Sequence, residues 1–162
     1  MNILVTGGTG FVGKALVEAL LSRGDSVTVL TRSIEKAQAI FPEKTLQFLT
    51  ALSTLKDLNG FDAVINLAGE PIFDKRWTVQ QKEKLRHSRI DLTQQIVQLI
   101  NQSKYPPVLI SGSATGIYGD GGEDVITEDT NPSTQFTAQL CIDWENAAKQ
   151  ANTRVCLVRT GL

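Results

Sequence analysis

The sequence is poor in several features, and each shortage excludes a class of protein. Its two cysteines, Cys141 and Cys156, are too few for a disulfide framework and lack metal-ligand spacing, so we expect two buried thiols in a reducing compartment. Sixteen basic and seventeen acidic residues leave a net charge of −1, which favours neither a nucleic-acid nor a membrane surface. No apolar run approaches the roughly 18 residues of a membrane span, and no charged leader precedes the first predicted strand. We therefore expect a cytoplasmic protein.

Histidine is scarcer still, because His87 is the only one. It lies in a polar stretch of a predicted long helix, and spacing identifies no serine or cysteine partner for it. We expect a solvated helix residue rather than a catalytic base.

Glycine, in contrast, is concentrated close to the start of the chain. A short apolar run predicts a buried strand, the glycines follow at once, and residues 15–21 predict a helix. Gly8, Gly10 and Gly13 satisfy G-x-G-x-x-G, while Gly7, Gly10 and Gly13 give a wider spacing of the same kind. Such glycines allow a tight turn, let a diphosphate approach the backbone, and let helix pack closely on strand. The order strand, glycine turn, helix predicts a dinucleotide site at the helix N-terminus.

The end of the second predicted strand, 26–30, indicates which dinucleotide is bound. An acid at this point hydrogen-bonds the ribose 2′-hydroxyl of NAD, whereas an arginine accommodates the 2′-phosphate of NADP. Asp25 lies before the strand, and Arg32 follows it. The sequence therefore predicts NADP, with Ser33 capping the next helix and reaching the same phosphate.

The remaining segments alternate between strand and helix patterns. They predict helices over 33–41, 79–101 and 134–151 and strands over 46–49, 107–111 and 154–159. Residues 62–69 predict a buried strand that runs into a small-residue loop, and residues 52–58 a helical or irregular segment. Six strands with right-handed crossovers imply an α/β fold, a doubly wound parallel sheet (Rossmann) in the order 3-2-1-4-5-6. We expect residues 1–162 to form one domain.

Two segments after predicted strands add candidate ligand contacts. Ala68 and Gly69 are small enough to let the backbone pass beside a ribose, although an ordinary turn would explain Gly69 equally well. Ser111 and Ser113 place hydroxyls at the carboxyl edge of the sheet, where ligands bind in open α/β folds. We expect these serines to lie near the nicotinamide.

Three segments together resemble the extended short-chain dehydrogenase/reductase superfamily: Gly7–Gly13, Asn66–Pro71 and Ser111–Gly119. Further segments are similar to an atypical subgroup of NADP-binding, epimerase-family proteins of poorly known substrate: Arg76-Trp77, Ser88–Ile90 with Thr93, and Leu140-Cys141 with Asp143–Glu145. The resemblance extends over the whole chain.

The resemblance implies a set of cofactor contacts. It implies a diphosphate loop of Gly7, Thr9, Gly10, Phe11, Val12 and Gly13, a 2′-phosphate site of Arg32 and Ser33, and a ribose loop of Leu67, Ala68, Gly69 and Glu70. Arg89 stands where relatives reach the cofactor with an asparagine, and Ser111 and Ser113 bracket the place of a catalytic Ser/Thr. The family also implies a homodimer through the helix at 79–101.

The catalytic dyad of the superfamily, Y-x-x-x-K, is missing. Tyr105 and Tyr118 have no lysine four places on, and the helix that would carry the dyad offers Thr137 with Cys141 or Cys141 with Glu145. Loss of a proton-transfer group typically reduces the rate by about 10² to 10⁴. Tyr118, Ser113 or Glu70 would have to substitute, and Ser113 and Tyr118 are our catalytic candidates; alternatively, both only shape the pocket.

Relatives of this type continue past the sixth strand into a region that closes over the substrate. We therefore expect this chain to be an N-terminal portion that lacks the C-terminal substrate region. Three functions remain open: an NADP-dependent reductase or epimerase acting on a sugar-nucleotide-like or carbonyl substrate, an NADP(H)-binding module with little or no turnover, and a scaffold that binds no dinucleotide. No metal site is predicted.

Overall fold

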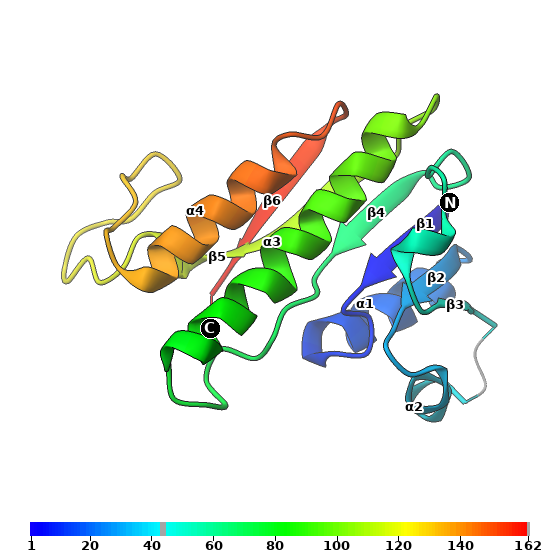
Figure 1. Cartoon of the computed structure of the whole chain (residues 1–162), viewed down its shortest axis with the longest axis horizontal. Coiled ribbons are helices and arrows are strands. Elements are labelled where there is room, and N and C mark those ends of the chain that lie inside the picture. The colour runs from blue at the N-terminus through cyan, green and yellow to red at the C-terminus, as the bar shows by residue number, and fades with distance from the viewer. Residues whose placement is uncertain (43–44, 162) are drawn as a thin grey trace.

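A computed structural model describes residues 1–42 and 45–161 of the chain. Six parallel strands form one sheet in the order β3-β2-β1-β4-β5-β6, as predicted (Figure 1). The strands are β1 (Asn2–Thr6), β2 (Ser26–Leu30), β3 (Gln47–Leu49), β4 (Ala63–Asn66), β5 (Val108–Ala114) and β6 (Val155–Thr160). The helices are α1 (Phe11–Ser22), α2 (Ile34–Ile40), α3 (Val79–Gln102) and α4 (Phe136–Ala148), with short 3-10 turns η1 (Leu52–Thr54) and η2 (Thr115–Ile117).

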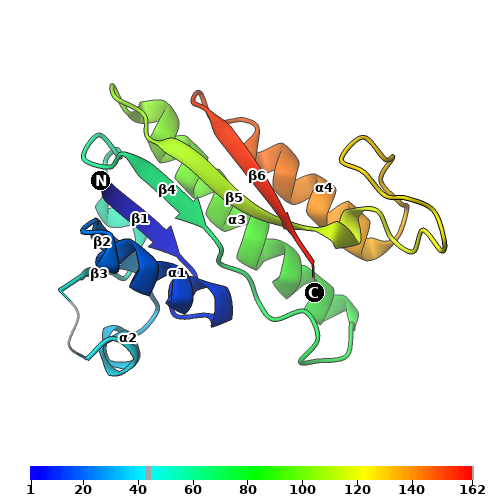
Figure 2. The same cartoon turned by 180° about the vertical axis from the view of Figure 1, so that it is seen from behind.

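The helices cover the two faces of the sheet unequally. The long helices α3 and α4 lie side by side over one face (Figure 1), whereas α1 and α2 lie on the other face at the β1–β3 end (Figure 2). Seen from that second side, β5 and β6 have no helix in front of them (Figure 2).

Two apolar clusters, one on each face, hold these layers together. Leu4 of β1 belongs to the cluster that includes Ile96 and Ile100 of α3, while its neighbours Ile3 and Val5 belong to the cluster that includes Val17 of α1. Successive strand residues point to opposite faces, so β1 contributes to both clusters. A strand buried on both faces reads as a continuous apolar run, which is why β1 could be predicted.

Cys156 shows where the prediction of two buried thiols was wrong. Cys141 is buried but Cys156 is exposed. On β6 the side chains alternate, so that Val155 and Leu157 pack on the core under α3 and α4 while Cys156 and Val158 point the other way. Cys156 is exposed because it points to the face that no helix covers in Figure 2.

Element boundaries differ from the predictions at two ligand-facing strands. β4 ends at Asn66, three residues before the end of the predicted segment, whereas β5 continues to Ala114. The extra residues of β5 pair with Val158–Thr160 of β6, a contact with a distant part of the chain. In the described part of the chain, no helix is both long and apolar enough to cross a membrane.

Candidate functional site

The glycine turn between β1 and α1 is shaped by backbone approaches that admit no side chain. Gly7 has φ +70°, a left-handed conformation that favours glycine, and its carbonyl accepts a hydrogen bond from Gly10 N at 3.0 Å. A Cβ on Gly13 would lie 2.1 Å from the Gly7 carbonyl oxygen, and a Cβ on Gly7 would lie 2.7 Å from the backbone of Leu67. These contacts make Gly7 and Gly13 the two positions where the turn requires glycine.

The turn ends at a helix N-terminus that faces outward at the carboxyl edge of the sheet. Gly10 is the N-cap of α1 and provides no side-chain hydrogen bond, and the first turn of α1 contains no acidic residue. Phe11 and Val12 are exposed, at 97% and 53%. The first amides of a helix have no internal acceptor, so those of α1 can bind an anion. Their position between β1 and β4, where the strand order reverses, is the usual ligand site of such sheets.

Arg32 and Ser33 follow β2 next to this turn. Ser33 caps α2, as predicted, because its Oγ accepts a hydrogen bond from Lys36 N at 3.3 Å. Arg32 is exposed and forms no ion pair among the residues that the structure describes. Its guanidinium is therefore available to a ligand phosphate.

The loop after β4 is fixed to the neighbouring elements through its backbone. Leu67 N donates to the Thr6 carbonyl at 3.1 Å and Ala68 N to Thr6 Oγ1 at 3.2 Å. Glu70 N donates to Ser88 Oγ at 2.9 Å, and the Glu70 carboxylate pairs with Lys75 at 3.0 Å. The hydrogen bond and charge of Lys75 lower the pKa of Glu70, so Glu70 is a poor proton acceptor in this conformation.

A buried polar chain behind the loop was missed from the sequence. Thr6 Oγ1 donates to Asn66 Oδ1 at 2.6 Å, Asn66 Nδ2 donates to Thr93 Oγ1 at 2.8 Å, and Trp144 Nε1 donates to the same oxygen at 2.9 Å. The chain joins β1, β4, α3 and α4, and all four residues are buried. In the sequence, this network is indicated only by Thr6 and Asn66, the polar residues that end the buried strands β1 and β4. Their partners on α3 and α4 are distant in the sequence.

Ser113 lies in a second polar network, which links it indirectly to Tyr118. Ser113 Oγ donates to Glu145 Oε1 at 2.7 Å, and Arg159 binds both carboxylate oxygens of Glu145, at 2.8 Å and 2.9 Å. Arg159 Nη1 donates to the Tyr118 hydroxyl oxygen at 2.5 Å. Burial pushes the pKa of Glu145 up, but hydrogen bonds from Arg159 and Ser113 outweigh it and hold the pKa below its ordinary value. Glu145 is therefore an ionised anchor for its neighbours.

The two candidate catalytic residues, Ser113 and Tyr118, line two different but adjacent cavities. One, of about 390 Å³, contains Ser113 and is also lined by Val12 and Leu67 from the cofactor side and by Arg89 and Cys141 from the helices. Burial raises the pKa of the Cys141 thiol. Tyr118 does not line this cavity; it lines a neighbouring one of about 370 Å³ with Arg159.

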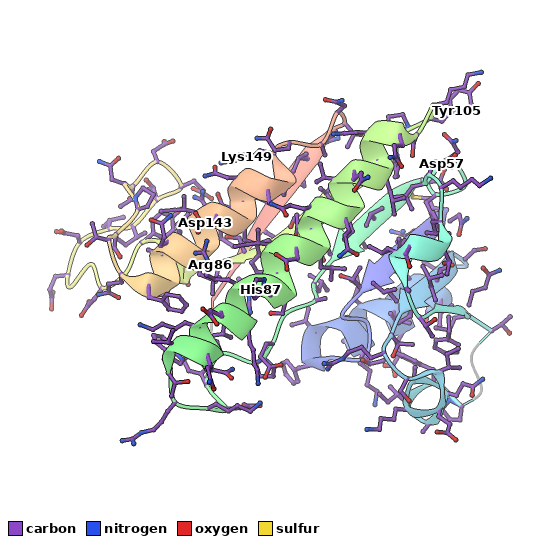
Figure 3. All side chains as sticks on the ribbon, viewed as in Figure 1. Asp57, Arg86, His87, Tyr105, Asp143 and Lys149 are labelled. Carbon is purple, nitrogen blue, oxygen red and sulfur yellow. The ribbon has the colours of Figure 1, made fainter. Side chains whose placement is uncertain are left out.

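Other predicted residues lie around the larger cavity or away from it. Thr137 lines it beside Cys141 on α4, while Ser111 is 1% exposed and is not among its lining residues. His87 is an exposed residue of α3, as predicted (Figure 3), and its Nδ1 lies 2.8 Å from the Asp91 carboxylate. Within the described ranges, no three His, Cys, Asp or Glu side chains are grouped so that they could hold a metal ion.

Comparison with known families agrees with this geometry. The family model described as the NAD dependent epimerase/dehydratase family matches residues 3–161. The chain belongs to this family. A family member from Arabidopsis thaliana, the chloroplastic epimerase family protein SDR39U1 homolog, is 39% identical over 170 residues, which span 100% of this chain and 49% of that protein. Epimerase family protein YfhF of Bacillus subtilis is 37% identical over 151 residues, 90% of this chain and 48% of that protein.

A solved structure of the family has the same fold as this chain. The crystal structure of human epimerase family protein SDR39U1 with NADPH superposes with a TM-score of 0.83 at 30% identity, covering 98% of this chain and 53% of that one. This epimerase-family chain thus spans about half the length of the relatives it matches.

Proposed function

We propose that this epimerase-family chain binds NADP(H) between the glycine turn and the carboxyl ends of β4 and β5. The observation that carries the proposal is the cradle at Gly7 and Gly13, where a Cβ would lie 2.7 Å and 2.1 Å from backbone atoms. Such a surface leaves room for a diphosphate against main-chain amides and no room for side chains. The NADPH in the human SDR39U1 structure supports the choice of ligand.

Each group around this cradle has a separate role in the proposal. The amides of Thr9 and of Phe11–Gly13 hold the diphosphate, while Gly10, whose own amide donates to the Gly7 carbonyl, leaves room for it beside the backbone. The guanidinium of Arg32, which forms no ion pair among the described residues, holds the 2′-phosphate with the hydroxyl of Ser33. The loop Leu67–Glu70 passes beside a ribose, and Arg89 adds a cationic group to the cavity. Ser111 is buried beneath the cavity surface and does not contact the nicotinamide itself.

For chemistry, we infer reductase or epimerase activity on a carbonyl or sugar-nucleotide-like substrate in the cavity that contains Ser113. When bound, the cofactor supplies hydride transfer. Ser113 donates its only hydroxyl proton to Glu145 at 2.7 Å, so its oxygen is free to accept a hydrogen bond from a substrate hydroxyl. Tyr118 would contact the substrate only if its hydroxyl moved away from Arg159 or if the two cavities joined.

A second candidate function is NADP(H) binding with little or no turnover. The observation that favours it is the engagement of both candidate proton-transfer groups: Ser113 is bound to Glu145, and Tyr118 accepts from Arg159. Binding then stabilises the chain without consuming the cofactor. A screen of carbonyl substrates with NADPH separates the candidates, because absorbance loss at the nicotinamide band occurs only with turnover.

Cofactor choice is tested by titrating NADPH and NADH while nicotinamide fluorescence is recorded. Arg32→Ala should weaken NADPH binding about 10- to 100-fold, the contribution of a charged hydrogen-bonded contact, and leave NADH binding nearly unchanged. Equal losses for the two cofactors would show that Arg32 does not meet the 2′-phosphate. Lys36→Ala, on the exposed side of α2, is the control.

A further inference from the structure

The guanidinium of Arg89 is a half-buried cation for which the described residues provide no counter-ion. It comes from α3, lines the cavity of about 390 Å³, and takes part in none of the ion pairs of the described residues. Burial lowers its pKa, and the negative charge of Glu70 opposes this shift without forming an ion pair with Arg89, because the Glu70 carboxylate pairs with Lys75. A desolvated charge without a partner is costly, and folded proteins pair such charges.

The protein holds Arg89 in one orientation. Nη1 donates to the Leu85 carbonyl at 3.2 Å and lies 3.4 Å from Ser88 Oγ, which ties one side of the guanidinium to its own helix. Cζ lies 5.4 Å from the centre of the Trp144 ring, within the range of a cation–π contact. These contacts fix the direction in which the guanidinium points.

Gly69 covers a face of the guanidinium and leaves its edge open. A Cβ on Gly69 would lie 2.8 Å from Arg89 Cζ, closer than to Nη2 at 3.0 Å or Nε at 3.1 Å. An atom nearest to the central carbon stacks on the plane of the group. Gly69 has no positive φ, so its backbone conformation does not require a glycine; a side chain there would instead force the guanidinium of Arg89 to shift.

The remaining edge, formed by Nε and Nη2, has no acceptor in the described part of the chain. The buried side-chain atom without a partner in those residues is Gln81 Nε2, so neither Arg89 nitrogen is sealed inside the protein. Two parallel N–H groups on a planar cation match the two oxygens of a carboxylate or phosphate.

We propose that the Nε–Nη2 edge of Arg89 binds an oxyanion, a phosphate or a carboxylate, inside the cavity that contains Ser113. The inference rests on the proposed function, because it takes the cavity to hold the cofactor and its substrate. The oxyanion has two sources: the diphosphate of the cofactor, or an acidic group of the substrate. In the second case the substrate class narrows to carbonyl or sugar-nucleotide compounds with a carboxylate or phosphate.

The test follows the Nε–H resonance of Arg89 in the ¹⁵N spectrum of the whole chain, assigned by its loss in Arg89→Lys. NADPH is added first, and malonate or inorganic phosphate is then added to the loaded protein. A shift with NADPH assigns the oxyanion to the cofactor, and a shift only with malonate or phosphate assigns it to the substrate. No shift in either titration overturns the proposal.

Binding affinities of the Arg89 variant test the proposal independently of the NMR shifts. Arg89→Lys keeps the charge and loses the planar edge, and should weaken the ligand that shifts the resonance about 10- to 100-fold. The matched control is Arg86→Lys, one turn earlier on α3, where the arginine already pairs with Asp143 of α4 (Figure 3). Equal affinities in both variants would contradict the proposal.

Failure of the proposed function is distinguishable from failure of this inference. If NADPH does not bind the wild-type chain at all, the proposed function is wrong. Malonate and phosphate are then titrated against the free protein, and the Arg89 resonance still reports whether its edge binds an oxyanion.

Discussion

At the scale of single residues, the account depends most on Gly13. A methyl group there would meet the Gly7 carbonyl oxygen at 2.1 Å, and a backbone oxygen cannot move aside as a flexible side chain would. We expect Gly13→Ala to open the turn and to weaken NADPH binding at least about 10-fold, because the amides that hold the diphosphate are displaced.

Gly60→Ala is the control for that change. A Cβ on Gly60 would have no neighbour within 4 Å, and Gly60 has no positive φ. Fluorescence titration of both variants with NADPH compares them directly. If Gly13→Ala binds as tightly as Gly60→Ala, the glycine turn is not the diphosphate site.

Glu145 is the second residue whose change has a definite expected result. Its side chain is 2% exposed and binds Arg159 through both oxygens, so Glu145→Gln leaves a charged guanidinium without its counter-ion. We expect a loss of about 2 to 4 kcal/mol in the free energy of unfolding; a quarter of the Arg159 side chain is exposed, which reduces the cost from that of a fully buried pair. Urea unfolding measures it.

The pH dependence of the stability of Glu145→Gln tests whether the lost ion pair is the cause of the destabilisation. Because the pKa of Glu145 is below its ordinary value of 4.5 in the folded chain, the pair stabilises the protein above that pH and the stability is lost as the pH falls through the folded pKa. Glu145→Gln should therefore show less loss of stability in acid than the wild type. Asp143→Asn on the same helix removes a more exposed pair and should cost less than about 1 kcal/mol.

At the scale of elements, contiguous sequence patterns predicted the helices, strands and caps better than patterns that depend on distant parts of the chain. The β1 strand, the glycine turn and α1 are contiguous, so the run before Gly7 and the helix after Gly13 could be recognised together. The Ser33 cap of α2 was predicted for the same reason. The end of β5 was not, because the residues after Ser111 are strand only through pairing with β6.

The polar networks could not be predicted for a related reason. Thr93, Trp144 and Asn66 lie on three elements that meet only in the folded sheet, and Glu145 reaches Ser113 over 32 residues. A helical stripe containing Trp144 is typical of packing, and nothing in its spacing indicates that its Nε1 serves Thr93. Contacts of this kind can be predicted only when the order of the strands and the crossovers between them are known, because the residue pattern of a single element does not contain them.

The cap of α3 provides a prediction at this scale. Thr78 Oγ1 accepts from Gln81 N at 3.2 Å at the start of the 24-residue helix. Thr78→Ala should lower the free energy of unfolding by about 1 kcal/mol, the usual cost of a lost N-cap, and Thr78→Ser should restore it. Thermal unfolding of the two variants checks this, and equal stabilities would show that the cap contributes nothing.

At the scale of the whole molecule, cofactor binding and stability are coupled. A ligand that binds only the folded state adds about 2.7 kcal/mol at a concentration of 100 Kd. NADPH should therefore raise the melting temperature progressively with concentration, and NADH should do so less. A melting temperature that does not respond to either cofactor would support the scaffold hypothesis.

Association of two copies through α3 stays a proposal at the same scale. The outward residues of α3 include His87, which Figure 3 labels, and Asp91; both are exposed and polar. We expect any dimer through this face to be held by polar contacts and to weaken with salt. Sedimentation at low and high ionic strength would reveal it, and a single monomer species at every concentration would remove the proposal.

The most direct test of the central claim is a crystal structure of the chain soaked in NADPH. We predict a diphosphate against the amides at the start of α1 and a 2′-phosphate beside Arg32. Density for the cofactor elsewhere, or a side chain of the protein lying against the first amides of α1 in the soaked crystal, would contradict the account.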